Sequence, residues 1–240
     1  MKDAKAQGGK WSDPDFPPEP SSLVPPKLWK AKVEAKPKWA TIAWRRPEDI
    51  TGLTNSHGHP QLYHGLIEPN DIKQGAIGNC WVLSALSALA EFPDRVRNLF
   101  VNEGVDEHGI YGLKVTKNGV QRTVFVDDLL PTRGGKLFFL RNQGPELWAS
   151  IIEKVWAKVH GSYSHVEGGV SMACLRDLTG APAVVHRMTP GEPNPELFRK
   201  VKEADDRRFI ICASCSSRMS ATKAELRDMG LWGEHAYSII

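Results

Sequence analysis

Residues 74–93 read QGAIGNCWVLSALSALAEFP, and this stretch decides the fold. Its Ala- and Leu-rich part is apolar on nearly all sides and runs into a proline, so we expect a buried helix over residues 80–92. The N-terminus of that helix directs N–H groups and a partial positive charge at Cys80, which favours the thiolate. Gly75 and Gly78, just before it, allow a tight backbone approach to a ligand. Cys80 is therefore either a nucleophile or a buried, inert thiol, since free cysteines commonly pack as small hydrophobes.

Two other residues favour the nucleophile. Gln74 lies six positions before Cys80, where its amide and the Cys80 backbone N–H would together form an oxyanion hole. His235 precedes the strand-like run AYSII and lies 155 positions after the cysteine. Papain-type enzymes separate these two residues by about 130 to 150 positions and place an aromatic residue after the cysteine, here Trp81. Taken alone, His235 is more simply a surface or core histidine. The hypothesis that Cys80 is a nucleophile therefore depends on the Cys–His spacing and the predicted helix together.

Five blocks of the sequence resemble successive blocks of the calpain protease core, in the same order. They are residues 74–93 and the segments FVDDLLPTRGGKLFF (125–139), ELWASIIEKVWAKVHGSYSHVEGG (146–169), DLTGAP (177–182) and EHAYSI (234–239). The match extends from about Trp44 to the last residue. Several blocks in register over such a length are far more specific than a short motif.

The resemblance implies an α+β protein with the papain-like cysteine protease fold. A helical subdomain that carries the nucleophile would occupy residues 44–181, and a β-rich subdomain that carries the histidine would occupy residues 182–240. Residues 1–43 would form a Pro-, Lys- and Trp-rich extension. In calpains a catalytic Asn within an NPWG-like block follows the histidine by some distance, whereas this chain ends at Ile240. We therefore expect an incomplete, truncated histidine subdomain and an isolated chain that is poorly active or inactive.

The resemblance also assigns roles to single residues. Cys80 would be the nucleophile, His235 the general base and then acid, and Gln74 the oxyanion donor of an intracellular endopeptidase that cleaves protein substrates. Two positions depart from the family, because Asn79 stands where calpains usually have Asp and Glu234 where they usually have Gly. The alternative from a different class is a calpain-fold module that binds or scaffolds without cleaving. A third interpretation, a structural thiol protein with chance matches, requires Cys80 and His235 to lie far apart.

A calcium site is a further implication of the resemblance. Calpains bind calcium in the first subdomain through backbone carbonyls and two carboxylates, and the matching positions here are Asp71 and Glu146. Oxygen ligands suit a hard cation such as Ca²⁺. Each residue also has a structural explanation, because Asp71 would cap a turn and Glu146 would favour the first turn of a helix. Asp127 and Asp128 point to opposite faces of a predicted strand and are expected to be structural.

The rest of the chain allows coarser predictions. Eight of the seventeen prolines lie before residue 48, so we expect an extended arm without a packed helix, laid across its own domain rather than offered to a partner. The pair Asn118-Gly119 predicts the turn of a β-hairpin. Residues 145–161 place apolar side chains on one stripe with Lys and Glu opposite, which predicts an amphipathic helix. Shorter elements follow Gly180, including a charged helix over residues 196–206.

Composition narrows the classes of function. The 240 residues carry 31 Lys+Arg against 28 Asp+Glu, a formal net charge of +3, which gives no electrostatic footprint for nucleic acid. No stretch approaches the 18 or so apolar residues of a membrane span, and the first residues lack the apolar core of a signal peptide. We therefore expect a cytoplasmic protein without a membrane span, whose four cysteines are free thiols. The sequence identifies no regulatory domain or partner.

Overall fold

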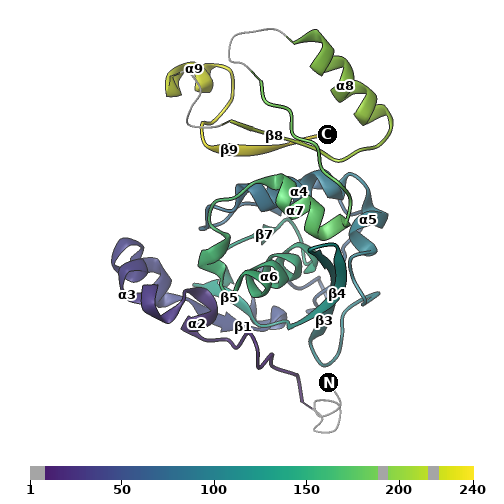
Figure 1. Ribbon diagram of the computed structural model, residues 1–240. Helices are drawn as coiled ribbons and strands as arrows, with labels where there is room; N and C mark the ends of the chain where they lie inside the picture. Colours follow the sequence, from purple (N-terminus) through teal and green to yellow (C-terminus); the bar gives the residue numbers. More distant parts are fainter. Residues whose placement is uncertain (1–8, 189–193, 216–221) are drawn as a thin grey trace.

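The computed structural model describes residues 9–188, 194–215 and 222–240. At its centre lies helix α4 (Cys80–Ala90), which begins at Cys80 as the sequence predicts (Figure 1). Nine of the eleven residues of α4 are buried, because Ala, Leu and Val occupy almost every side of the helix. α4 packs against α7 (Ser171–Thr179) and α5 (Pro93–Arg97). The first sequence block thus forms part of the hydrophobic core rather than a surface element.

A second central helix, α6 (Trp148–His160), corrects one expectation. The residues predicted to lie on its polar side include Glu153 and Lys154, yet Glu153 is 3% exposed and Lys154 is fully buried. The ion pair of Lys154 with Asp127 neutralises one of these charges inside the core. α6 ends where Gly161 adopts a left-handed φ of 91°, a conformation that glycine enters at little cost.

Within residues 9–188, 194–215 and 222–240 the strands form four small antiparallel sheets, so the fold is α+β as expected. They are β1 (Ala43–Arg45) with β5 (Leu130–Arg133) and β6 (Lys136–Leu137), β2 (Ile72–Lys73) with β7 (Arg141–Asn142), β3 (Ile110–Lys117) with β4 (Val120–Asp127), and β8 (Ile211–Cys215) with β9 (His235–Ile239). The predicted hairpin is confirmed, since β3 and β4 pair around Asn118 (φ 52°) and Gly119 (φ 76°). Asp127 and Asp128, at the end of this hairpin, pair with Lys154 and Arg46, which confirms a structural role.

The N-terminal arm is not the helix-free extension that its prolines predict. It contains α2 (Pro20–Leu23), α3 (Pro26–Ala35) and the short 3₁₀ turns η1 (Pro37–Thr41) and η2 (Pro47–Asp49). Each of these begins with proline, and the first turn tolerates proline because its N–H groups have no intrahelical partner.

The arm lies across its own domain, as predicted. Trp39 is 1% exposed, and its ring lies 5.2 Å from that of Phe139. Lys32 and Lys36 of the arm both form ion pairs with Glu167, which follows the 3₁₀ turn η4 (Tyr163–Val166). The Trp-rich arm is therefore part of the core and not an exposed docking strip.

The later elements gather above α4 and α7 (Figure 1). They are α8 (Pro195–Asp206), the β8–β9 pair and α9 (Lys223–Asp228). β9 packs on α4, and the Cys212 thiol donates to the Ser84 carbonyl oxygen at 3.6 Å. A guanidinium N–H of Arg95 donates to the carbonyl oxygen of Arg208 at 2.8 Å. These contacts hold the β8–β9 pair, in which His235 is the first residue of β9, against α4.

Candidate functional site

The candidate site centres on Cys80, the first residue of α4. The side chain is half-buried, and the residue before it, Asn79, is fully buried. The Asn79 carbonyl oxygen accepts hydrogen bonds from the backbone N–H groups of Val82 (2.8 Å) and Leu83 (3.1 Å), which closes the first turn of the helix. Cys80 therefore lies in the first turn of the helix. The N–H groups of that turn have no partner within the helix and favour an anion near them.

The glycines before Cys80 serve the backbone of the loop. A Cβ at Gly75 would lie 1.4 Å from the carbonyl oxygen of Phe139, so no other residue fits there. The expected close approach is thus to the protein's own chain and not to a ligand. At Gly78 nothing described lies within 4 Å of such a Cβ, but its carbonyl oxygen accepts from the Gly168 N–H at 2.9 Å.

Gln74 begins the same loop, and its side chain folds back on it. Its Nε2 donates to the carbonyl oxygen of Ile77 at 3.0 Å. A side-chain amide has two N–H donors, and this bond uses one of them. The structure thus fixes the orientation of the Gln74 amide within the loop that leads to Cys80.

His235 opens strand β9, opposite Cys215 on β8. Its imidazole is half-buried and meets the ring of Tyr237 edge-to-face at 5.0 Å. The residue before it, Glu234, has a φ of 55°, a left-handed conformation that costs a residue with a Cβ. Because β9 packs on α4, the structure brings the histidine strand and the cysteine helix together.

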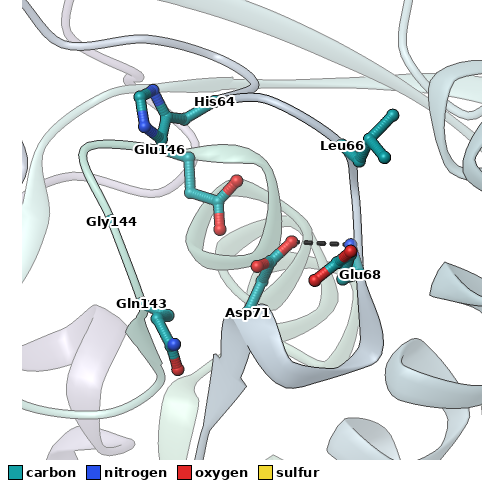
Figure 2. Close-up of a pocket in the computed structure, with 7 residues that line it drawn as sticks. All are labelled: His64, Leu66, Glu68, Asp71, Gln143, Gly144 and Glu146. Atoms are coloured by element: carbon teal, nitrogen blue, oxygen red, sulfur yellow. Dashed lines mark hydrogen bonds between the residues drawn. The ribbon is translucent and has the colours of Figure 1, made fainter.

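A separate pocket of about 320 Å³ contains both predicted calcium ligands (Figure 2). Asp71 comes from η3 (Pro69–Asp71), and Glu146 lies just before α6. The other lining residues are His64, Leu66, Glu68, Gln143 and Gly144. Figure 2 shows the two carboxylates directed into the same space. The sequence prediction that pairs Asp71 with Glu146 therefore corresponds to a shared cavity.

The electrostatics of this pocket favour a cation. Glu146 is 2% exposed, and among the described residues its Oε2 has no hydrogen-bond partner. Burial, followed by the nearby Asp71 carboxylate, raises the pKa of Glu146 to about 7. Burial also raises the pKa of Asp71, although its Oδ2 accepts from the Glu68 N–H at 2.7 Å. Two carboxyl groups in one pocket, with the Oε2 of Glu146 lacking a hydrogen-bond partner among the described residues, fit a hard cation such as Ca²⁺.

One buried pair beside Cys80 is not predictable from any pattern in the sequence. The Nδ2 of Asn79 donates to Oε1 of Glu153 at 2.7 Å, and the Leu140 N–H donates to Oε2 at 3.1 Å. Burial raises the pKa of Glu153 to about 7. The only signal in the sequence is an acidic residue next to the apolar stripe of the predicted helix 145–161, which is ordinary on an amphipathic helix.

The sequence of this chain is similar to those of known proteins. The sequence model of the family described as "Calpain family cysteine protease" matches residues 11–240. Calpain-5 of Caenorhabditis elegans is 32% identical over 232 residues, which are 91% of this chain and 35% of that protein. The calpain-2 catalytic subunit of Bos taurus is 32% identical over 236 residues, 97% of this chain and 32% of that protein.

The similarity extends to plants. The calpain-type cysteine protease ADL1 of Oryza sativa subsp. japonica is 31% identical over 238 residues, 96% of this chain and 11% of that protein. This chain is thus similar to cysteine proteases over nearly all of its length, and it belongs to the calpain family. It spans about a third or less of the length of these relatives. In the described part of the chain no helix is long and apolar enough to cross a membrane.

Proposed function

We propose that this chain carries the nucleophile and the histidine of a calpain-like cysteine endopeptidase that cleaves protein substrates. Cys80 is the nucleophile, His235 the general base and then acid, and Gln74 the oxyanion donor. The observation that carries the proposal is the packing of β9, which His235 opens, on α4, which Cys80 opens. This packing argues against a structural thiol protein in which the two residues are remote.

The chemistry follows from these positions. The Cys80 thiolate attacks the carbonyl carbon of a peptide, a C–S bond forms, and the negative charge moves to the carbonyl oxygen. The Cys80 backbone N–H and the second N–H of Gln74 stabilise that oxygen. The His235 imidazolium protonates the leaving amine as the C–N bond breaks. Water then attacks the thioester, His235 accepts its proton, and the carboxylic acid product leaves with Cys80 regenerated.

The proposed architecture is papain-like, with a nucleophile subdomain over residues 44–181 and a histidine subdomain over residues 182–240. The arrangement in Figure 1 supports this division, because α8, α9, β8 and β9 gather on one side of α4. A cleft between two such subdomains would place an extended substrate across the N-terminus of α4.

Reaction with an epoxysuccinyl peptide, followed by peptide mass analysis, tests the proposal. We expect Cys80 to be modified at least about 100-fold faster than Cys215, which is also half-buried but lies on strand β8 instead of opening a helix. His235→Ala should remove this preference, and His186→Ala, an exposed histidine, should keep it. If Cys80 and Cys215 react equally in the unaltered chain, the protease proposal fails.

That negative result would favour the second candidate, a calpain-fold module that binds or scaffolds without cleaving. Two residues next to the proposed catalytic residues favour this second candidate. Asn79 and Glu234 flank Cys80 and His235 and differ from the residues usual in the family. Of these, Glu234 adopts a left-handed φ of 55° that Gly would enter without strain. Such a module would keep the fold and the calcium pocket but lose the selective reactivity of Cys80.

We also propose that Asp71 and Glu146 hold a calcium ion. The shared pocket and the buried Oε2 of Glu146, which has no hydrogen-bond partner in the part of the chain that the structure describes, support this assignment. When bound, Ca²⁺ would supply positive charge that offsets the repulsion between the two carboxylates. Groups of three or more acidic, His or Cys side chains suited to a metal are absent from the described residues, so carbonyl and water oxygens would complete the shell.

Thermal unfolding with and without Ca²⁺ tests this second assignment. Millimolar Ca²⁺ should raise the Tm of the unaltered chain, because an ion that binds only the folded state stabilises it. Glu146→Gln should abolish the rise, whereas Glu103→Gln, an exposed residue outside the pocket, should keep it. An equal rise in all three proteins would contradict a site at Glu146.

A further inference from the structure

Two buried polar residues meet between the nucleophile helix and α6 without taking part in the proposed chemistry. Asn79 is fully buried and Glu153 is 3% exposed. They lie 74 positions apart in the chain, and the Nδ2 of Asn79 donates to Oε1 of Glu153 at 2.7 Å. The second carboxyl oxygen of Glu153 accepts the Leu140 N–H at 3.1 Å. One carboxyl group therefore holds two segments that are distant in sequence.

The first of these segments carries an oxyanion donor. The peptide between Asn79 and Cys80 is planar, so the orientation of Asn79 sets the direction of the Cys80 N–H. The Asn79 carbonyl already caps the first turn of α4 through Val82 and Leu83. The hydrogen bond from Asn79 Nδ2 to Glu153 adds a contact to the side chain. This bond restricts the rotation of the Asn79 side chain in the core.

The second segment supports the other end of the same loop. The Ala76 N–H donates to the carbonyl oxygen of Phe138 at 3.0 Å, and Gly75 closes on the carbonyl of Phe139. Leu140, which Glu153 binds, is the next residue. Glu153 thus acts on both ends of the nucleophile loop, which we define as residues 74–80.

The chemistry of Glu153 is not that of a packing residue. A buried carboxyl group is costly to desolvate, and an apolar side chain of similar volume would fill the space without that cost. Its neighbour on α6, Lys154, has an ionic partner in Asp127, but among the described residues no Lys, Arg or His forms a salt bridge with Glu153. Its two acceptor oxygens are used entirely on the segments that flank the nucleophile loop.

We propose that Glu153, acting through Asn79 and Leu140, is a positioning residue that holds the nucleophile loop in the geometry the oxyanion requires. It touches neither substrate nor sulfur. The role rests on the proposed function, because a positioned oxyanion donor matters only if Cys80 attacks a carbonyl. Among the described residues Oδ1 of Asn79 is buried without a hydrogen-bond partner, so the bond to Glu153 is what anchors that side chain.

Two thiol reagents with different structural requirements distinguish a positioning role of Glu153 from an effect on stability alone. Iodoacetamide requires only the thiolate of Cys80, whereas an epoxysuccinyl peptide also requires the loop and cleft in place. We expect Glu153→Ala and Asn79→Ala each to lower the ratio of the two Cys80 labelling rates (epoxysuccinyl peptide over iodoacetamide) by at least about tenfold, since a misplaced oxyanion donor costs 10²- to 10³-fold. Ser150→Ala, a buried polar residue one turn earlier on α6, should leave the ratio unchanged.

The conservative variant provides the rescue. In Glu153→Gln the amide oxygen still accepts the Leu140 N–H, and the amide N–H reaches Oδ1 of Asn79 once that side chain turns over. This variant should therefore keep the labelling ratio within about threefold of the unaltered chain. A purely structural role predicts instead that the ratio is the same in all folded variants, whatever their Tm.

The outcomes distinguish the two proposals. If Cys80 of the unaltered chain shows no selective reaction with the epoxysuccinyl peptide, the protease proposal itself fails. If that reaction is present and Asn79→Ala and Glu153→Ala keep the ratio, the positioning role is overturned while the protease proposal stands. Should Glu153→Ala not fold by circular dichroism, Asn79→Ala decides, because it removes the same contact without removing the buried carboxyl group.

Discussion

Replacing Glu153 by Gln should change how the stability of the protein depends on pH. Glu153 is buried, and burial is the main reason that its pKa lies at about 7 in the folded protein, compared with an ordinary value of 4.5. The hydrogen bonds from Leu140 and Asn79 lower that pKa but do not cancel the effect of burial. Gln has nearly the same shape and never ionises, so the variant removes this titration and little else.

The sign of the effect follows from the raised pKa. The stabilising contribution of a protonated Glu153 is fully present below the unfolded pKa of 4.5 and is lost as the pH rises through the folded pKa of about 7. One pKa unit corresponds to about 1.4 kcal/mol. Between pH 5 and pH 8 the free energy of unfolding of the unaltered chain should therefore fall by roughly 2 to 3 kcal/mol relative to Glu153→Gln.

Urea unfolding of both proteins at pH 5 and pH 8 measures this difference. Titrations shared by the two proteins cancel in the comparison, so only the change at position 153 remains. Glu103→Gln, at an exposed position, is the matched control and should follow the unaltered chain at both pH values. A gap between the unaltered chain and Glu153→Gln that is equal at pH 5 and pH 8 would refute the reasoning.

Two further substitutions test backbone geometry on either side of the site. Glu234 has a φ of 55°, so Glu234→Gly should raise the free energy of unfolding, measured in urea, by about 0.5 to 1 kcal/mol. A decrease of that size would show that the backbone at Glu234 is not strained. Gly75→Ala should lower it by about 3 kcal/mol or prevent folding, because the new Cβ would lie 1.4 Å from the Phe139 carbonyl oxygen. Gly78→Ala, with nothing described within 4 Å of the new Cβ, should cost less than about 1 kcal/mol. Equal losses at the two glycines would show that contact with Phe139 is not the cause.

Much of the fold was predictable because its signals are local. The apolar run of residues 80–92, followed by Pro93, predicts a buried helix without reference to the elements that pack on it. Asn118-Gly119 determines a tight turn in the same way, since a positive φ is a property of the residues themselves. The N-terminal arm shows the limit of this reasoning. Its prolines predict a segment without helices, yet each helix or turn there begins at a proline. The position of a proline within an element decides whether it breaks or starts a helix.

By itself, the sequence determined the buried helix that begins at Cys80, the family and the candidate catalytic residues, because these depend on short patterns and on blocks in a fixed order. Only the tertiary structure decided which buried polar groups meet. It pairs Asn79 with Glu153 and directs Asp71 and Glu146 into one pocket. Helical periodicity places Glu153 on the polar side of α6, but the packing of α4 and the 138–140 segment around that helix encloses it. The partners of a buried acid depend on how elements that are distant in the sequence are arranged in space. The spacing of residues along the chain does not predict that arrangement.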